Sequence, residues 1–101
     1  MERYLEHIVL FKLKPETTEA EEAELIRRLR DLKHQIPGII ELTAGRNVRD
    51  ISHGYTVGLI VRLRDVDALE AYRAHPAHQE ILKYIEQVTE TRLAVDYYTV
   101  E

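Results

Sequence analysis

The sequence predicts a single α+β domain with the element order β-α-β-β-α-β, in which four antiparallel strands form one sheet. Apolar residues alternate with polar ones in four segments, as they do in strands that bury one face. Between the first and second of these segments, and between the third and fourth, apolar residues recur with the helical period instead. No linker, repeat or low-complexity segment divides the chain, so we expect one domain over residues 1–101.

The first strand and the first helix are expected at residues 4–13 and 17–35. Pro15 ends the strand, since proline has no N–H to donate to a neighbouring strand. Thr18 and Glu21 have the spacing of a capping box, in which each side chain accepts a hydrogen bond from the backbone of the other. The apolar stripe of this helix consists of Leu25, Leu29 and Leu32.

The other elements are predicted from the same two patterns, alternation for strands and the helical period for helices. Strands are expected at residues 39–48, 55–64 and 92–100, and helices at residues 65–74 and 76–88. Pro76 suits the first position of a helix, because the N–H that it lacks would have no helical partner there. The resulting order is that of the split βαβ, or ferredoxin-like, motif.

The helices can cover only one face of such a sheet, and the second face is also apolar. Strand alternation places Ile8 and Leu10 of the first strand, Ile60 of the third and Leu42 of the second on this face. Leaving it in water would forfeit roughly 25 cal/mol for each Å² that could be buried. We therefore expect an isologous homodimer, in which two sheets pack face to face.

The composition excludes several classes of partner. The chain has 18 acidic and 14 basic residues, and its basic cluster at residues 27–30 follows acidic residues on a helix, so we expect no nucleic-acid partner. It has no cysteine for disulfides or thiolate metal sites. The N-terminus lacks a signal-peptide pattern and no apolar run reaches membrane-spanning length, so we expect a cytoplasmic protein without a membrane partner.

Ionisable residues in unusual positions mark a candidate site. His7 and Asp96 lie inside apolar strands, and Tyr72 and His78 flank a helix-breaking proline. A neutral His78 at a helix start, with Asp96 holding the proton on one ring nitrogen, could act as a general base. The Tyr72 hydroxyl could then donate to a developing enolate oxygen. Alternatively, these side chains form a buried hydrogen-bonded network with a structural role alone.

Four stretches have the pattern of a known family. They are His7–Pro15 (HIVLFKLKP), Gly54–Leu59 (GYTVGL), Leu69–His78 (LEAYRAHPAH) and Val95–Tyr97 (VDY). The chain resembles the Dabb family, the stress-responsive dimeric α/β-barrel proteins, over essentially its whole length, and His-Pro-x-His after a tyrosine is the most specific part. The resemblance implies a ferredoxin-like unit of which two copies form a dimeric α/β barrel.

The resemblance also implies a pocket between the sheet and the helices. The family includes a plant polyketide cyclase that works without a cofactor, and its motif places His78, oriented by Asp96, beside Tyr72, with His7 also in the pocket. The implied ligand-binding residues are Val9, Phe11, Leu29, Val57, Leu59, Ile81 and Leu82. Val57 stands in place of a pocket histidine of the cyclase, Leu29 in place of a tyrosine and Leu82 in place of a glycine. A different and smaller ligand is therefore implied.

Metal binding has little side-chain support. His75 and His78 are three residues apart with a proline between them, and no HExxH or Cys/His pattern for zinc is present. Some family members hold a hard cation on backbone carbonyls where the first helix ends, which here implies the carbonyls of Lys33, Ile36 and Ile39. Such ligation leaves no side-chain signature. We expect no cofactor.

Three interpretations of function remain. The first, which we favour, is a small-molecule binder or a cofactor-independent acid–base enzyme of the cyclase, lyase or isomerase type. The second is a noncatalytic, stress-associated homodimer with structural histidines. The third is a cofactor-free oxygenase, which ranks last because related oxygenases often use tryptophan and this chain has none. A cavity of about 300 Å³ or more that touches His7, Tyr72 and His78 would separate the first from the second.

Overall fold

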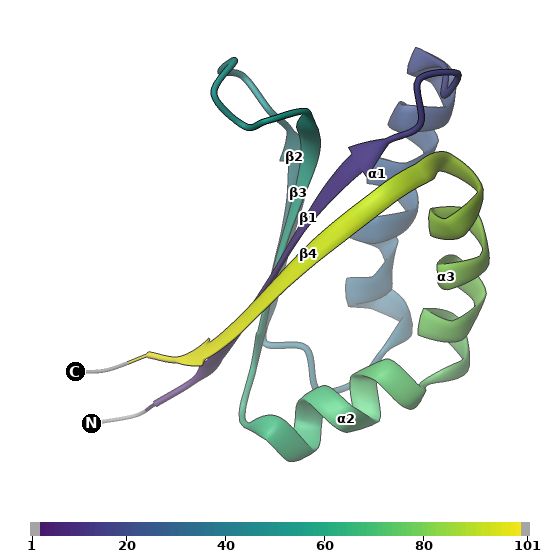
Figure 1. Ribbon diagram of the computed structural model, residues 1–101. Coiled ribbons are helices and arrows are strands. Elements are labelled where there is room, and N and C mark those ends of the chain that lie inside the picture. The colour runs from purple at the N-terminus through teal and green to yellow at the C-terminus, as the bar shows by residue number, and fades with distance from the viewer. Residues whose placement is uncertain (1–2, 100–101) are drawn as a thin grey trace.

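Residues 3–99 of the computed structural model form two layers, a sheet and a set of helices that covers one of its faces (Figure 1). The elements in chain order are β1 (Leu5–Leu13), α1 (Glu19–Gln35), β2 (Glu41–Arg46), β3 (Tyr55–Leu63), α2 (Val66–Ala74), α3 (Pro76–Val88) and β4 (Thr89–Tyr98). This is the predicted order, and the two predicted helices that follow β3 meet at His75. Within the described residues, no helix is long and apolar enough to cross a membrane.

The sheet is antiparallel throughout and has the strand order β2-β3-β1-β4. The first and last strands of the chain are therefore neighbours, and β1 lies between β3 and β4. This pairing sets His7 of β1 directly opposite Asp96 of β4. Residues that lie opposite each other on neighbouring strands point to the same face of the sheet.

The capping box predicted at the start of α1 is confirmed. The Thr18 hydroxyl accepts the Glu21 N–H (3.1 Å), and the Glu21 carboxylate accepts the Thr18 N–H (2.9 Å), so both halves of the capping box form. The apolar stripe Leu25, Leu29 and Leu32 is fully buried. These contacts anchor α1 on the sheet and make it one wall of the space under the helices.

Two strands, β2 and β4, differ from the prediction by more than one residue at their ends. β2 is shorter than residues 39–48, although the Ile40 N–H still donates to the Arg62 carbonyl (2.9 Å) beside the strand. β4 begins at Thr89 instead of residue 92, because the residue that caps the end of α3 also starts the strand. The predicted end of this strand at Val100 lies outside the described residues.

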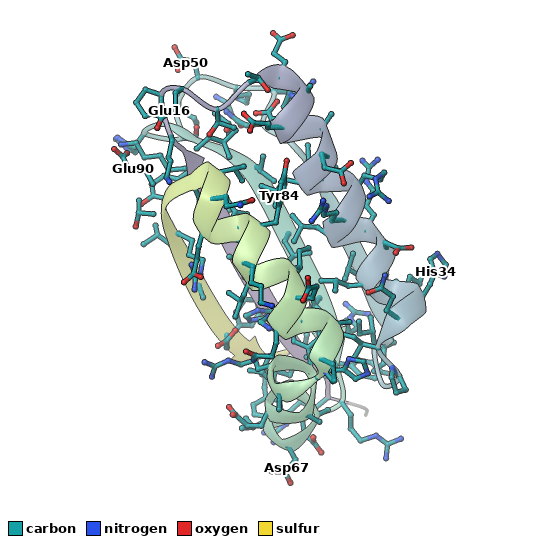
Figure 2. The ribbon with its side chains drawn as sticks, turned by 90° about the vertical axis from the view of Figure 1, so that its right-hand side faces the viewer. Glu16, His34, Asp50, Asp67, Tyr84 and Glu90 are labelled. Atoms are coloured by element: carbon teal, nitrogen blue, oxygen red, sulfur yellow. The ribbon has the colours of Figure 1, made fainter. Side chains whose placement is uncertain are left out.

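The core lies between the sheet and the helices. β1 and β3 contribute alternate residues to it: Leu5, Val9, Phe11, Val57, Leu59, Val61 and Leu63. Helices α1 and α3 pack beside each other over these residues, and the Tyr84 hydroxyl of α3 donates to the Glu21 carbonyl of α1 (3.2 Å) (Figure 2). Arg28 of α1 also lies over the Tyr84 ring, 4.2 Å from its centroid.

The face of the sheet opposite the helices is apolar and open, as expected, but the residues that form it are not all the predicted ones. Its exposed apolar residues are Leu10, Ile60, Leu93, Val95 and Tyr97, which are 40–57% exposed. The placement of Leu42 on this face was wrong: Leu42 lies opposite Val61 and is 7% exposed in the core. Cross-strand partners share a face, so the register with β3 turns Leu42 toward the helices.

Candidate ligand cavity with two histidines and a tyrosine

A cavity of about 520 Å³ lies between the sheet and the helices. Its floor is formed by β1, β3 and β4, and its walls by all three helices. The four predicted acid–base residues all line it: His7, Tyr72, His78 and Asp96. The cavity therefore exceeds the volume of about 300 Å³ that a small ligand needs, and it touches His7, Tyr72 and His78 as the first interpretation requires.

His7 and Asp96 form the imidazole–carboxylate pair of the cavity. Their side chains meet across β1 and β4, with His7 Nδ1 2.5 Å from Asp96 Oδ1. His7 is 8% exposed, whereas the Asp96 side chain is 39% exposed. A carboxylate at Nδ1 holds the proton on that nitrogen, so the neutral ring keeps Nε2 as an acceptor.

The structure corrects the predicted partner of Asp96. We expected Asp96 to orient His78, but it pairs with His7 instead. His7 occupies the directly opposite position on the neighbouring strand, whereas His78 lies on a helix above the sheet. Within the described residues, His78 Nδ1 is buried and has no hydrogen-bond partner.

Tyr72 lies between the two histidines. Its ring centroid is 4.8 Å from that of His78 and 5.9 Å from that of His7, in edge-to-face geometry in both cases. Tyr72 is 2% exposed, and this burial raises the pKa of its hydroxyl. The phenol therefore keeps its proton at neutral pH and can act as a hydrogen-bond donor.

The break between α2 and α3 fixes the position of His78. His75 ends α2 and caps α3, and its Nδ1 accepts the Ala77 N–H (3.0 Å). Pro76 is the first residue of α3, as predicted, so His78 falls in the first turn of this helix.

The surroundings of His78 favour its neutral form. Burial lowers the pKa of the imidazole, and repulsion from His7 in its protonated form and from Arg73 and Arg92 lowers it further. A backbone hydrogen bond to Arg73 opposes this shift. The sequence argument gave the same direction but attributed it to the helix start, whereas burial is the main cause.

Most of the predicted ligand-binding residues line the cavity. They are Val9, Phe11, Leu29, Leu59, Ile81 and Leu82. Val57 does not line it: it lies farther along β3, opposite Phe11, and is packed in the core. The lining of this cavity therefore gives no support to the expected contact between Val57 and a ligand, although its cross-strand neighbour Phe11 does line the cavity.

Sequence reasoning missed several residues of the cavity. These are Leu32, Glu70, Arg73, Ala74, Gln79, Ile85, Arg92 and Ala94. A signal for part of this set was present, since Arg92 and Ala94 precede Asp96 at intervals of two and therefore share its face of β4. Glu70 and Arg73 adjoin Tyr72 on α2, but nothing in the sequence shows that they reach the cavity.

The side chains offer little for a metal ion. Among residues 3–99, no group of three or more histidine, cysteine, aspartate or glutamate side chains could hold one. Lys33 and Ile36 lie at the end of α1, and Ile39 lies in the link to β2, outside the cavity lining. A cation on their carbonyls stays a prediction and has no part in the site described here.

The fold and the cavity together define a ferredoxin-like α+β protein with an ionisable pocket between its layers. The chain belongs to the stress responsive A/B barrel domain (Dabb) family, whose sequence model matches residues 5–99. Olivetolic acid cyclase of Cannabis sativa is 28% identical over 95 residues, which cover 92% of this chain and 94% of that protein.

Solved structures agree with this assignment. A dimeric ferredoxin-like protein of unknown function from Bacteroides fragilis has a TM-score of 0.81 and 25% identity, covering 95% of this chain and 96% of the other. The hydroxynitrile lyase of Passiflora edulis has a TM-score of 0.87 at 19% identity, covering 97% and 94%. At this low identity, the similarity to the lyase shows that the two proteins share a fold.

Proposed function

We propose that this protein binds a small carbonyl compound in the cavity and abstracts a proton from the carbon beside the carbonyl, without a cofactor. The reaction class is that of a cyclase, lyase or isomerase. The observation that carries the proposal is the contact of a neutral, half-buried His78 with the protonated Tyr72 inside a cavity of about 520 Å³. A base and a hydrogen-bond donor side by side are what enolate formation needs.

His78 is the base in this proposal. Its lowered pKa leaves the imidazole neutral at pH 7, so a ring nitrogen can accept the proton. His78 lines the cavity, which brings its ring beside a substrate bound there, and Nδ1 has no hydrogen-bond partner within residues 3–99. The C–H bond beside the carbonyl breaks, its electron pair moves into the enolate, and the proton passes to His78.

Tyr72 stabilises the oxygen on which negative charge develops. Burial keeps the phenol protonated, and its ring lies against His78. A hydrogen bond to the enolate oxygen is stronger than one to the ground-state carbonyl, so the donor lowers the barrier. His7, oriented by Asp96, supplies a second proton-transfer group in the same cavity.

The relatives support a catalytic role over a purely structural one. One relative is a cyclase and a protein of the same fold is a hydroxynitrile lyase, so this fold carries enzymes. A noncatalytic dimer with structural histidines would have those side chains satisfied by one another. His78 Nδ1 has no such partner in the described part of the chain.

The test is hydrogen–deuterium exchange at the carbon beside the carbonyl of small ketones in D₂O, followed by proton NMR. We expect the protein to accelerate exchange over buffer and Tyr72→Phe to slow it by about 10²-fold, the scale of one lost oxyanion donor. Tyr55→Phe, outside the cavity, is the matched control. Equal rates for the protein and for buffer would contradict the proposal.

We also infer a homodimer through the open face of the sheet. Three strands contribute exposed apolar residues to this face, among them Leu10, Ile60 and Val95. Ferredoxin-like relatives of known structure from Thermobifida fusca and Bacteroides fragilis are described as dimeric. Packing two such faces together would remove the patch from water and leave the cavity free, since it lies on the opposite side of the sheet.

A further inference from the structure

The cavity extends along β4. Arg92, Ala94 and Asp96 lie on the helix-facing side of this strand, opposite Phe11, Val9 and His7 of β1, and all three line the cavity. The small Ala94 side chain leaves the floor open between the two charged residues. The space therefore runs from the His7–Asp96 pair, past Ala94, to Arg92.

Arg92 differs from the other charged residues that line the cavity. Asp96 is paired with His7, and Arg73 is paired with Glu70 at 3.6 Å. Within residues 3–99, Arg92 has no ion-pair partner. The cavity thus contains one positive charge that the protein does not neutralise, on a side chain whose fork of N–H groups matches a carboxylate.

We propose that Arg92 binds a carboxylate of the substrate, and that the substrate class is an oxo acid with an apolar chain between its carbonyl and its carboxylate. This inference rests on the proposed function, which places the carbonyl at Tyr72 and His78. The middle of the substrate would lie over Ala94 against apolar wall residues such as Val9 and Ile85.

The length of the cavity floor along β4 bears on the separation of the two groups, because Tyr72 contacts His7, the partner of Asp96, at one end, and Arg92 lies at the other. Arg92 and Asp96 are four residues apart, which is about 13 Å along a strand. The arginine side chain shortens this span but does not close it. An oxo acid with several methylenes between its carbonyl and its carboxylate therefore matches this span better than an acid in which the two groups are adjacent.

Electrostatics link Arg92 to the proposed base. Its positive charge is among the influences that lower the pKa of His78, after burial and together with His7 and Arg73. A carboxylate bound at Arg92 would offset that charge. His78 would then become more basic when the substrate is present, which suits a group that must accept a proton.

The test is an NMR titration of the protein with 7-oxooctanoate and with its neutral amide, at constant ionic strength. We expect the acid to bind at least about tenfold more tightly than the amide, the worth of a charge-assisted hydrogen bond, and to shift signals of cavity residues. Arg92→Gln should abolish this preference. Arg64→Gln, an exposed arginine outside the cavity, should keep it.

The outcomes separate this inference from the proposed function. If the amide and the acid bind in the cavity with equal affinity, or if Arg92→Gln keeps the preference, the carboxylate assignment is wrong and the carbonyl site stands. If neither binds in the cavity, both are wrong. A titration with inorganic phosphate is the third arm: if phosphate displaces the acid at equal concentration, the site recognises phosphoryl groups and the carboxylate assignment is overturned.

Discussion

His7 and Asp96 lie opposite each other on β1 and β4, with Nδ1 of the histidine 2.5 Å from Oδ1 of the aspartate. The histidine is buried, whereas the aspartate is partly open to solvent. A carboxylate in this position fixes both the tautomer and the orientation of the imidazole. The pair therefore holds the His7 ring in place beside Tyr72, which in turn contacts His78.

The first prediction concerns this pair. Asp96→Asn keeps the shape of the side chain but removes its charge, so we expect the His7 ring to lose its single tautomer. The ¹⁵N shifts of the ring nitrogens should move, while the free energy of unfolding should change by less than about 1 kcal/mol because the carboxylate is partly exposed. Asp67→Asn, on the exposed start of α2, is the control. Unchanged His7 ring shifts in Asp96→Asn would show that the carboxylate does not orient this ring.

The second prediction concerns pH. Burial and nearby positive charges lower the pKa of His78 in the folded protein from its ordinary value of 6.5. Below pH 6.5 the unfolded chain binds this proton more readily than the folded chain does, so the stability that His78 contributes is lost as the pH falls. We expect the ring to titrate below pH 6.5, and the exchange rate to fall over the same range. An NMR titration, with His78→Ala to assign the signal, checks this; a midpoint at or above 6.5 would contradict it.

The third prediction concerns the cap that positions His78. His75 Nδ1 accepts the Ala77 N–H at the start of α3. His75→Ala removes this acceptor, which should cost about 0.5–2 kcal/mol of unfolding free energy. The exchange rate should also fall, because His78 lies in the turn that the cap fixes. His75→Ser supplies a hydroxyl oxygen as the capping acceptor in place of Nδ1 and should restore both, as measured by chemical denaturation and the exchange assay. A rate that stays low in His75→Ser would mean that His75 acts in some way other than capping.

The fourth prediction concerns assembly. Leu10→Asp or Ile60→Asp places a charge in the centre of the open face of the sheet. A dimer would have to bury this charge without a partner, so we expect monomers or insoluble protein by light scattering. Val48→Asp, at an apolar residue that is 94% exposed in the β2–β3 link, should leave the dimer intact. An intact dimer in both sheet variants would exclude face-to-face packing.

Much of the fold could be predicted because each element has a clear period and a defined end. The leucine stripe and the Thr18–Glu21 cap specify α1 locally, and both are present in the structure. Leu42 was misplaced because β2 is short and follows Ile39 and Ile40, so alternation within the strand does not decide which face is buried. Its register with β3 decides this, and register depends on contacts between distant parts of the chain.

The residues of the candidate site could also be predicted in part, but the contacts between them could not. The sequence identified four ionisable residues of the cavity, since histidine, aspartate and tyrosine are conspicuous among apolar neighbours. It did not identify which of them pair, because the His7–Asp96 contact depends on the register of β1 against β4, whose residues are 89 positions apart in the chain. Alternation places Arg92 on the same face of β4 as Asp96, but it does not show how far the cavity extends along the strand, and Arg92 was missed for this reason.

Deuterium exchange with and without His78 tests the central claim of proton abstraction in the cavity most directly. The protein, His78→Ala and the control His34→Ala are compared on the same ketone, His34 being an exposed histidine at the end of α1 that points away from the helical layer (Figure 2). We predict that His78→Ala lowers the exchange rate by about 10²–10⁴-fold, the usual effect of removing one general base, while His34→Ala retains it. Equal exchange rates in all three proteins would contradict the assignment of His78 as the base.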